Sequence, residues 1–297
     1  MTETRVVFVE APARLHMGLI DLRGDFGRRF GGLGAALEAP SLLLEARAAS
    51  ELSVTGEGAE RVREYARRFL DHEGIAQGAA VRVHRSIPAH AGLGSGTQLA
   101  LATARALSAL FGRSWDVPAL AQATGRAQRS AIGTFAFEQG GFLLEGGRKT
   151  GSDRAAPLLL RRALPAEWRC VIAIPPVPRG LNGPAEEEAF KHLPAPPAEI
   201  VGRISQLVLM AVLPALVEED LAGFGRGITE VQRLVGETFL PVQGARFAHP
   251  AVGELVEALL QAGAAGAGQS SWGPAAFGLF AGEAGAAAAV TALADRG

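Results

Sequence analysis

The chain contains a single cysteine, Cys170, among its 297 residues. One cysteine excludes an internal disulfide and a zinc site built from several thiolates. Cys170 lies in the apolar run CVIAIP, which predicts a buried thiol on a strand and not a nucleophile. Lysine is almost as scarce, since Lys149 and Lys191 are the two lysines of the chain, whereas arginine is abundant. Any anion site in this protein must therefore use arginine or backbone amides.

Long apolar runs are also missing from the sequence. The N-terminal stretch MTETRVVFVEAPARLHMG lacks the continuous apolar core of a signal peptide. No run approaches the roughly 20 apolar residues that span a bilayer. These absences predict a cytoplasmic protein that has no membrane partner.

Excess charge of either sign is absent as well, because 29 basic and 30 acidic residues give a formal net charge of −1. This balance predicts no nucleic-acid partner, and leaves a local basic pocket as the means of attracting an anion. With 48% hydrophobic residues over 297 positions, the chain can bury a large core. Its length predicts one large or two ordinary domains.

A glycine-rich loop between a predicted strand (81–83) and a predicted helix (from Thr97) is the most informative feature present. Such a loop exposes successive backbone N–H groups at the positive end of a helix dipole, where a phosphate binds well. The alternative is a tight turn that needs glycine for packing. The loop is not a Walker motif, since the G-K-[ST] ending is missing. The predicted phosphate-binding residues are Gly92, Leu93, Gly94, Ser95, Gly96 and Thr97.

The segment 11–40 is dense in glycine, arginine and aspartate, and its irregular pattern predicts a long functional loop. Its polar groups supply cations for phosphate and carboxylates for a metal or a proton. The alternative for any one of them is a solvated charge or a turn cap. The candidates are Arg14, His16, Asp21, Asp25, Arg28 and Arg29.

Further candidate ligand contacts lie in three other segments. Ser130 and Thr134 precede a glycine pair, and Arg179 lies in a proline-rich loop. A second glycine loop carries amide and hydroxyl groups beside an indole that can stack on an aromatic ligand. The alternatives are satisfied turn backbone and a core tryptophan. The residues of this second loop are Gln269, Ser270, Ser271 and Trp272.

Hydrophobic periodicity predicts an α+β protein in which a second unit begins near residue 158. We expect strands at 5–10, 42–46, 52–55, 158–160, 169–174 and 275–281, and a hairpin over 135–144 that bends at Gln139-Gly140-Gly141. We expect further helices at 59–72, 117–128, 199–217, 221–235 and 250–262, and an alanine-rich helix at the C-terminus. Glu186, Glu187 and Glu188 are expected to begin a helix, where they favour its dipole.

Three motifs, APARLHMGLIDL, IPAHAGLGSGTQLAL and SWGPAAFGLF, resemble in order those of the GHMP kinase superfamily. The resemblance implies an N-terminal domain like ribosomal protein S5 domain 2 (1–157) and a ferredoxin-like C-terminal domain (158–297). Two kinase groups are missing, however. Gly96 replaces a serine that helps to hold magnesium, and RSAIGTFAFEQ supplies no catalytic aspartate. Phosphoryl transfer depends on such groups, so kinase activity is not favoured.

Four longer segments, ARLHMGLIDLRGDFGRRFGGLG, IPAHAGLGSGTQLALA, RSAIGTFAFEQGGF and GQSSWGP, resemble one branch, the beta-ribofuranosylaminobenzene 5'-phosphate synthase family. That family joins 4-aminobenzoate to phosphoribosyl pyrophosphate (PRPP) and releases pyrophosphate and carbon dioxide in tetrahydromethanopterin biosynthesis. The resemblance implies a glycosyltransferase that uses Mg²⁺, with PRPP and 4-aminobenzoate as its small-molecule partners, and by analogy a homodimer. The rival hypotheses are an ATP-dependent small-molecule kinase and a non-catalytic sensor of phosphate ligands.

The same resemblance suggests a role for each candidate residue. The glycine loop would hold pyrophosphate or the 5'-phosphate, while Arg14, Arg28 or Arg29 neutralises charge on departure. Asp21 or Asp25 would bind Mg²⁺ or stabilise the cationic ribosyl centre. His16 would be a proton or hydrogen-bond partner. Ser130, Thr134 and Arg179 would contact substrate, and residues 269–272 would seat the aromatic acid.

Overall fold

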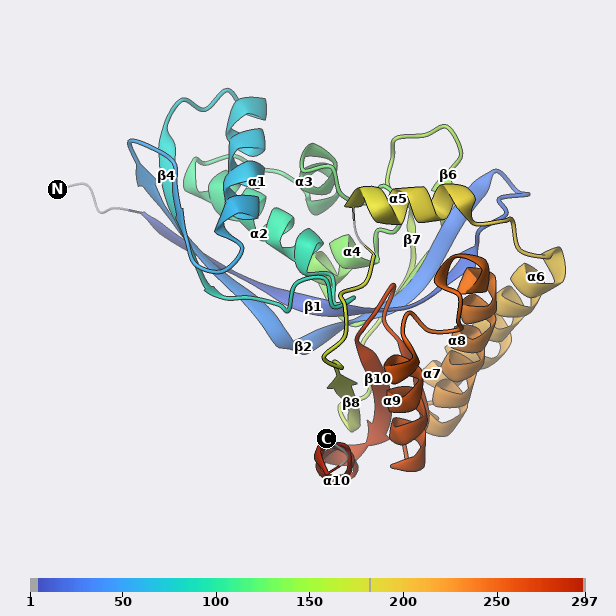
Figure 1. Cartoon of the computed structure of the whole chain (residues 1–297). Coiled ribbons are helices and arrows are strands. Elements are labelled where there is room, and N and C mark those ends of the chain that lie inside the picture. The colour runs from blue at the N-terminus through green and yellow to red at the C-terminus, as the bar shows by residue number, and fades with distance from the viewer. Residues whose placement is uncertain (1–4, 182, 296–297) are drawn as a thin grey trace.

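A computed structural model describes residues 5–181 and 183–295 (Figure 1). A seven-stranded sheet contains the path β3-β4-β2-β5-β7, with β1 and β6 also paired to β2. Its strands are β1 (Val6–Asp21), β2 (Arg28–Ala49), β3 (Ser53–Thr55), β4 (Gly78–Arg85), β5 (Phe142–Glu145), β6 (Arg148–Lys149) and β7 (Leu158–Arg162). A three-stranded antiparallel sheet has the order β8 (Trp168–Ala173), β10 (Ala276–Ala281) and β9 (Gly266–Gln269).

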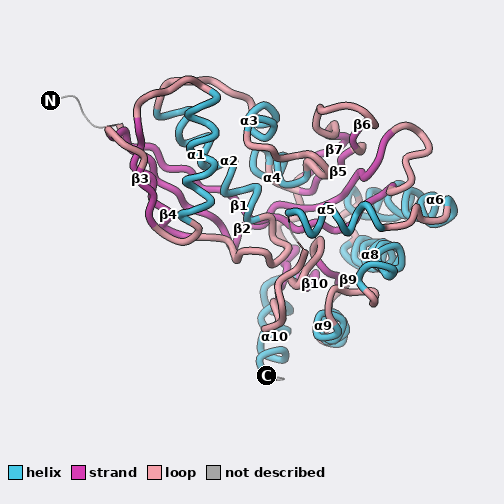
Figure 2. Tube along the Cα trace, turned by 45° about the horizontal axis from the view of Figure 1, so that its top comes forward, coloured by secondary structure: helices cyan, strands magenta, loops and turns pink. Residues whose placement is uncertain are grey.

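The helices are drawn in cyan in the tube view (Figure 2). Those that precede β8 in the chain are α1 (Ala59–His72), α2 (Ser95–Leu110), α3 (Val117–Ala123) and α4 (Ile132–Gln139). Those that follow β8 are α5 (Gly183–His192), α6 (Ala198–Leu207), the π-helix η1 (Val208–Val212), α7 (Leu213–Val217), α8 (Leu221–Gln243), α9 (Pro250–Gln261) and α10 (Gly282–Ala294). The predicted helices at 59–72, 199–217 and 250–262 are confirmed to within a residue.

The prediction that the segment 11–40 forms a long irregular loop is wrong. Most of it belongs to the two longest strands, β1 and β2, which pair antiparallel along nearly their whole length. Register shifts between Pro12 and Arg14 and between His16 and Gly18 interrupt the pairing. Bulges of this kind break the two-residue period that identifies a strand in a sequence. Apart from the turn between the strands, the glycine-rich composition therefore conceals a hairpin and not a loop.

Two short elements also differ from the prediction. The expected hairpin over 135–144 is helix α4 followed by strand β5, because Gly140 (φ 62°) and Gly141 (φ 79°) end a helix instead of turning a hairpin. Helix α3 stops at Ala123 and not near residue 128, and Gly125 (φ 69°) follows it in the left-handed conformation that often ends a helix. Its N-cap is Asp116, whose Oδ1 accepts from the Ala119 amide at 2.7 Å.

Strand β7 is an edge strand of the first sheet. Leu158–Arg162 pairs antiparallel with β5 and thus extends the first sheet beyond residue 157. Helix α8 buries Phe224 and Ile228 in the same core that the first sheet covers. Cys170 lies on β8 as predicted; it is half-buried, and burial raises the pKa of its thiol to about 12. The thiol is therefore protonated at neutral pH.

The stretch Ala198–Val217, which spans α6, η1 and α7, is long and apolar enough in composition to cross a membrane. This finding corrects the expectation that no apolar run approaches the length of a membrane span. Ile204, Val208 and Val212 are buried on one face of it. They join the core shared with the first sheet, which is the arrangement of a core helix in a folded domain.

Phe224 is the residue whose loss should most weaken the contact between the two halves. Its ring lies 5.6 Å from that of Phe142 on β5 and 5.0 Å from that of Trp168 on β8. Because it is fully buried, Phe224→Ala should lower the free energy of unfolding by about 3–5 kcal/mol. Phe26, which is 95% exposed, gives the control, since Phe26→Ala should change it by less than about 0.5 kcal/mol. Chemical denaturation measures both, and equal effects would contradict this packing.

Candidate active site

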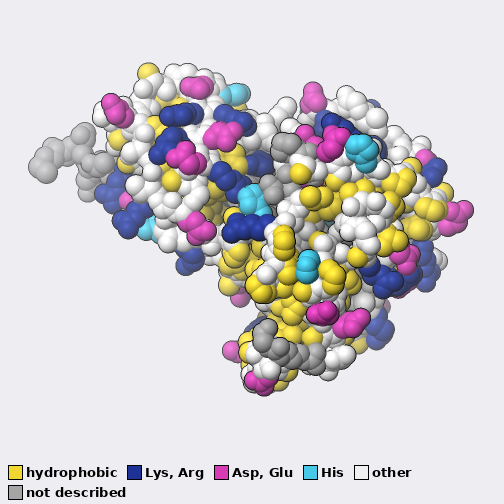
Figure 3. Space-filling view, viewed as in Figure 1, with side chains coloured by type: hydrophobic (Ala, Val, Ile, Leu, Met, Phe, Trp, Pro, Cys, Tyr) yellow, Lys and Arg dark blue, Asp and Glu magenta, His cyan; other side chains and the backbone are white. Residues whose placement is uncertain are grey.

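A cavity of about 450 Å³ lies where β1, the glycine loop, α5, α8 and the loop after β9 meet. Figure 3 shows basic side chains and a histidine gathered in the middle of one face of the molecule. The cavity is lined by a glycine loop, several cations and several aromatic rings. The charged and aromatic lining residues include Arg14, His16, Phe30, Arg61, Tyr65, His90, Arg126, Arg129, Glu186, Glu187, Phe190, Phe239, Arg246, Phe247 and Trp272.

The glycine loop leads directly into helix α2. Gly94 has φ 77° and is the N-cap, and its carbonyl accepts from the amides of Thr97 and Gln98 at 3.0 and 3.1 Å. Helix geometry leaves the amides of the first turn, at Ser95 and Gly96, without partners inside the helix. These amides and the positive end of the α2 dipole both favour an anion. The loop is thus built as an anion seat.

Two arginines flank this anion seat at Gly96. A Cβ atom added to Gly96 would lie 2.6 Å from Arg61 Nη2 and 3.7 Å from Arg126 Nη1. Arg126 also donates to the Tyr65 hydroxyl, and its guanidinium lies 5.1 Å from the centre of the Tyr65 ring. The cations come from α1 and from the loop after α3, so that elements far apart in the sequence place positive charge beside the same amides.

Arg14 on β1 approaches the anion seat from the other side. A Cβ atom on Gly94 would lie 2.9 Å from Arg14 Cγ, and the Arg14 guanidinium donates to the Gly92 carbonyl. Burial lowers the pKa of Arg14 to about 10, and the charges of Glu186 and Glu145 oppose that shift. Arg14 therefore stays cationic at neutral pH.

The loop after β9 holds the glycine loop in place. A Cβ atom on Gly92 would lie 2.2 Å from the Ser270 carbonyl oxygen, so this contact needs glycine. The Ser270 hydroxyl donates to the Gly92 carbonyl at 2.7 Å and accepts from the His16 amide at 3.0 Å. Ser270 is fully buried. It therefore joins β1 to the glycine loop without facing the cavity.

Next to Arg14 along the cavity lies a group formed by His16, Ser130 and Glu145. His16 Nε2 lies 3.2 Å from Ser130 Oγ. Burial and then the charge of Arg14 lower the pKa of His16 to about 3, so its ring is neutral at physiological pH. Glu145 is fully buried on β5, and its Oε2 accepts from the Ala131 amide at 2.5 Å. Burial raises the pKa of Glu145 to about 7.

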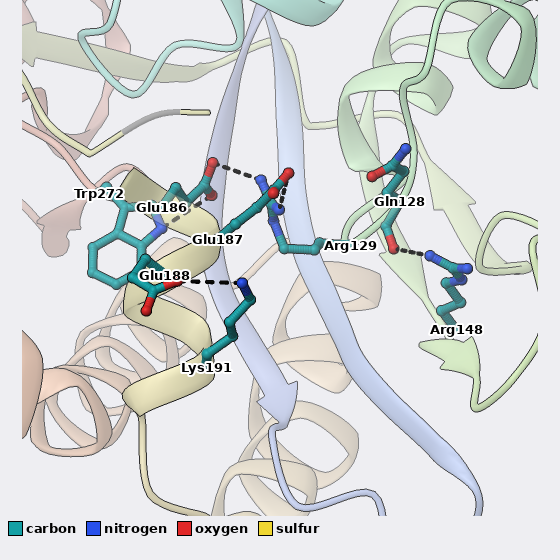
Figure 4. Close-up of polar contacts among 8 residues, drawn as sticks. All are labelled: Gln128, Arg129, Arg148, Glu186, Glu187, Glu188, Lys191 and Trp272. Atoms are coloured by element: carbon teal, nitrogen blue, oxygen red, sulfur yellow. Dashed lines mark hydrogen bonds and ion pairs between the residues drawn. The ribbon is translucent and has the colours of Figure 1, made fainter. Parts of the chain in front are cut away.

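The other end of the cavity is aromatic. The Trp272 ring lies 4.7 Å from that of Phe239 and 5.4 Å from that of Phe190, both close to edge-on. Figure 4 shows Glu186 on α5 between two donors. Its carboxylate accepts from Trp272 Nε1 at 3.1 Å and from Arg129 Nη2 at 2.7 Å. The ion pair with Arg129 joins α5 to the loop before α4 across the cavity.

One face of β1 contributes residues to both ends of the cavity, the end at the anion seat and the aromatic end. Arg14, His16 and Gly18 alternate with core residues along the strand, and all three line the cavity. A strand advances about 3.3 Å per residue, so Arg14 and Gly18 lie at opposite sides of His16. Gly18 contacts α8, since a Cβ there would lie 2.9 Å from Val231 Cγ1. His16 is thus placed between the anion seat and the aromatic end.

Curated relatives match this chain over most of its length. Beta-ribofuranosylphenol 5'-phosphate synthase of Methanothermobacter thermautotrophicus is 35% identical, over 91% of this chain and 88% of the relative. The protein of the same name from Archaeoglobus fulgidus is 36% identical, over 76% of this chain and 75% of the relative.

The chain belongs to this synthase family.

Two models of the wider superfamily place the synthase family among the GHMP kinases. The model "GHMP kinases N terminal domain" matches residues 60–141, and "GHMP kinases C terminal" matches residues 212–297. L. major mevalonate kinase in complex with R-mevalonate superposes with a TM-score of 0.74 at 15% identity, over 99% of this chain and 93% of that chain. Streptococcus pneumoniae phosphomevalonate kinase gives 0.71 at 12% identity, over 98% and 96%. These likenesses confirm the predicted GHMP kinase-like fold.

Most residues that the sequence suggested for this synthase do line the cavity. They are Arg14, His16, Gly92, Gly94, Ser95, Gly96, Thr97, Ser130, Gln269, Ser271 and Trp272. Leu93 points into the core instead, and Thr134 is buried in α4. Arg179 is outside the lining, although its charge helps to lower the pKa of the lining residue His90, after burial and Arg61.

The structure does not bring the two aspartates of the β1–β2 turn to the cavity. Asp21 Oδ1 accepts from the amides of Arg23 and Gly24, which is the turn-capping alternative. Asp25 pairs with Arg23 at 2.8 Å, and its side chain is 52% exposed. Neither residue is part of the cavity lining.

The arginine pair Arg28 and Arg29 also lies outside the cavity lining. Arg28 donates to the Gly147 carbonyl at 3.0 Å, and Arg29 donates to the Leu22 carbonyl at 3.1 Å. Both side chains therefore support turns at the far end of the hairpin. The positive charge that we expected Arg28 and Arg29 to place near a phosphate comes instead from Arg14, Arg61 and Arg126.

The sequence did not reveal several of the charged residues that lie in the cavity or directly beneath it. Arg61 lies on the predicted helix 59–72, and Arg126 and Arg129 lie near the end of the predicted helix 117–128. Glu145 follows an apolar strand and carries no motif. No local signal marks these residues, because each of them reaches the cavity through long-range packing.

Proposed function

We propose that this chain joins the C1 carbon of PRPP to an aromatic acid, with release of pyrophosphate and carbon dioxide. The supporting observation is a single cavity that is cationic at one end and aromatic at the other. The glycine loop with Arg14, Arg61 and Arg126 suits a polyanion, and the rings of Phe190, Phe239 and Trp272 suit a benzoate ring. An ATP-dependent kinase would also need a catalytic aspartate near this cavity, and the segment RSAIGTFAFEQ supplies none.

Within this proposal the anion seat neutralises the leaving pyrophosphate. Fixed N–H groups and guanidinium cations stabilise charge where it develops, without reorganising. The aromatic end holds the ring so that its carboxylate-bearing carbon faces C1 of the ribose, and such positioning supplies much of the rate. The new carbon–carbon bond forms at that ring carbon. Carbon dioxide then leaves, and its bonding electrons restore aromaticity.

The acceptor is 4-aminobenzoate in our sequence-based prediction, and we retain it as a proposal. The relatives, however, are named for a ribofuranosylphenol product. Such a product would form from 4-hydroxybenzoate by the same chemistry. The two acceptors differ in a single para substituent, so assays must offer both. In either case the product would enter tetrahydromethanopterin biosynthesis.

Mg²⁺ remains part of the proposal, but Asp25, the ligand that we expected, does not hold it. Asp25 does not line the cavity, and the carboxylates that do so in the described chain are Glu186 and Glu187. Within residues 5–181 and 183–295, no cluster of three or more His, Cys, Asp or Glu side chains forms a metal site. Mg²⁺ commonly takes one or two carboxylates together with substrate phosphates. Glu186 and Glu187 do not fit that pattern at the anion seat, because Glu186 already accepts from Trp272 and Arg129 at the aromatic end and Glu187 lies 3.7 Å from Arg129. We therefore assign the ion to the substrate phosphates, whose charge it would neutralise, and name no protein ligand for it.

The test is to incubate the protein and Mg²⁺ with PRPP and each acceptor, and separately with ATP and candidate alcohols. We expect pyrophosphate and carbon dioxide in equal amounts from PRPP with one or both acceptors, and no ADP from ATP. ADP formation without pyrophosphate would instead support the kinase hypothesis. Ligand binding without any turnover would support the sensor.

A further inference from the structure

Glu145 is a buried carboxyl group that has no role in the reaction proposed above. It is 0% exposed, and its Oε1 has no hydrogen-bond partner among the described residues. An ionised carboxylate with an unpartnered oxygen is costly away from water. A neutral carboxylic acid carries a proton on one oxygen and can donate it. The surroundings therefore favour the protonated form of Glu145 more than water would.

A short series of polar groups leads from Glu145 to the cavity. Hydrogen bonding from the side chain of Ser130, which lines the cavity, is among the influences that lower the pKa of the Glu145 carboxyl group. Ser130 Oγ also lies 3.2 Å from His16 Nε2. A Cβ atom on Gly32 would lie 3.2 Å from His16 Nε2 and 3.3 Å from Glu145 Oε1. Glycine at position 32 thus lets these groups approach one another beneath the cavity wall.

These groups lie beside the place where the bond to the leaving group would break. His16 follows Arg14 on the cavity face of β1, and Arg14 contacts the glycine loop at Gly94. Thr97 on the loop packs against the segment of Ser130, because a Cβ on Gly133 would lie 3.1 Å from Thr97 Cγ2. A diphosphate on the loop would therefore have the Ser130 hydroxyl at its ribose side.

We propose that Glu145, acting through the Ser130 hydroxyl, supplies a proton to the diphosphate that leaves from the glycine loop. This inference rests on the proposed function and adds a positioning residue to it. The neutral ring of His16 fixes the Ser130 hydroxyl by hydrogen bonding. Glu145 itself does not touch the substrate.

The step balances as follows. The bond between C1 and the diphosphate oxygen breaks, and its electron pair goes to that oxygen. The oxygen takes the hydroxyl proton of Ser130, and Ser130 takes the proton of Glu145. The ring carbon forms the new bond to C1, and the pair from its bond to carbon dioxide returns to the ring. Glu145 is left as a carboxylate and regains a proton from water before the next turnover.

The charged neighbours of Glu145 set the direction of its pH dependence. Burial raises the pKa of Glu145 to about 7, while the Ala131 amide, Ser130 and the charge of Arg14 lower it. On β1 the titratable groups near it are Arg14 and His16, and Glu186 on α5 interacts with Arg14. A bound polyanion cancels the field of Arg14, so it raises the pKa of Glu145 further. Ligand binding just above pH 7 should therefore take up a proton.

Calorimetric titration with inorganic pyrophosphate tests the proton without any turnover. At pH 7.5, in two buffers of different ionisation enthalpy, the wild type should take up roughly half a proton more than Glu145→Gln. Glu138→Gln, an exposed change on neighbouring α4, should match the wild type. Equal proton uptake by wild type and Glu145→Gln would overturn the proposal, as would a failure of pyrophosphate to bind.

Turnover provides the second readout. General acids commonly contribute 10²–10⁴-fold, so Glu145→Gln should lower kcat about 100-fold with a nearly unchanged KM for PRPP. The wild-type rate should fall as pH rises through the pKa of Glu145, and this decline should vanish in Glu145→Gln. Ser130→Ala removes only a hydroxyl group and should lower kcat to the same extent. A variant that is stable to heating but keeps the wild-type pH profile would refute the role.

The two proposals can fail separately. If the wild type never releases pyrophosphate from PRPP, the proposed function fails while the calorimetric difference still reports the proton on Glu145. If turnover is observed but both variants retain its rate and pH profile, the proposed function stands and the role of Glu145 is rejected.

Discussion

Gly94→Ala should weaken pyrophosphate binding about 100-fold while leaving the protein folded. Gly94 has φ 77°, and a non-glycine residue in this region costs about 1–2 kcal/mol. The added Cβ would also lie 2.9 Å from Arg14 Cγ, so that Arg14 must move from the anion seat. A charge-assisted hydrogen bond contributes about 1.5–3 kcal/mol. Calorimetric titration with pyrophosphate measures the loss.

Gly112→Ala is the matched control for this variant. Gly112 follows the other end of helix α2 with φ 67°, and a Cβ there would meet no atom within 4 Å. It should therefore incur a similar backbone strain without disturbing the anion seat. Its pyrophosphate affinity should equal that of the wild type. If both variants lost affinity equally, the effect would come from strain in α2 and not from the loop.

The double variant Arg61→Ala with Arg126→Ala should weaken pyrophosphate binding by at least about 100-fold. Both guanidinium groups face Gly96 at the N-terminus of α2, and each can make charge-assisted hydrogen bonds to a phosphate. Two such bonds at about 1.5 kcal/mol or more account for that factor. The affinity of the wild type should also fall with added salt more steeply than that of the variant. Titration at two salt concentrations measures both effects.

Arg68→Ala serves as the control on the same helix. Arg68 pairs with Glu64 on the exposed side of α1 and does not line the cavity. Its loss should leave pyrophosphate affinity within about twofold of the wild type, since exposed pairs contribute little. An equal loss in Arg68→Ala would mean that general charge, and not the placement at Gly96, governs binding.

Local patterns in the sequence correctly located the strand, the glycine loop and the helix around residues 92–97. A strand, three alternating glycines and an apolar helix are short-range features, and α2 begins at Ser95 within two residues of the expected start. Helix α1 and the strands β7, β8 and β10 followed from the same kind of periodicity. Such elements are predictable because their hydrogen bonds and buried faces repeat at a fixed interval.

The sequence misled us where irregular backbone interrupts that interval. The bulges in β1 hid a strand that carries Arg14 and His16 side by side on the cavity face. The sequence alone does not distinguish Arg14 and His16 from the other charged residues of this segment, which are Asp21, Asp25, Arg28 and Arg29. They lie near the far end of the same hairpin, however, and bond to turns. Seven strand positions separate Arg14 from Asp21, a distance of roughly 23 Å along β1.

The amino-acid sequence by itself determined the family, the glycine loop before α2 and most helices, because these depend on residues that are neighbours in the chain. Only the tertiary structure decided which side chains share the cavity. Arg61, Arg126, Glu145 and Glu186 come from four separate elements, and Glu145 is buried beneath a serine that the sequence suggested for another reason. Their charges and the pKa of Glu145 depend on distance and burial, which long-range packing sets and local sequence does not record.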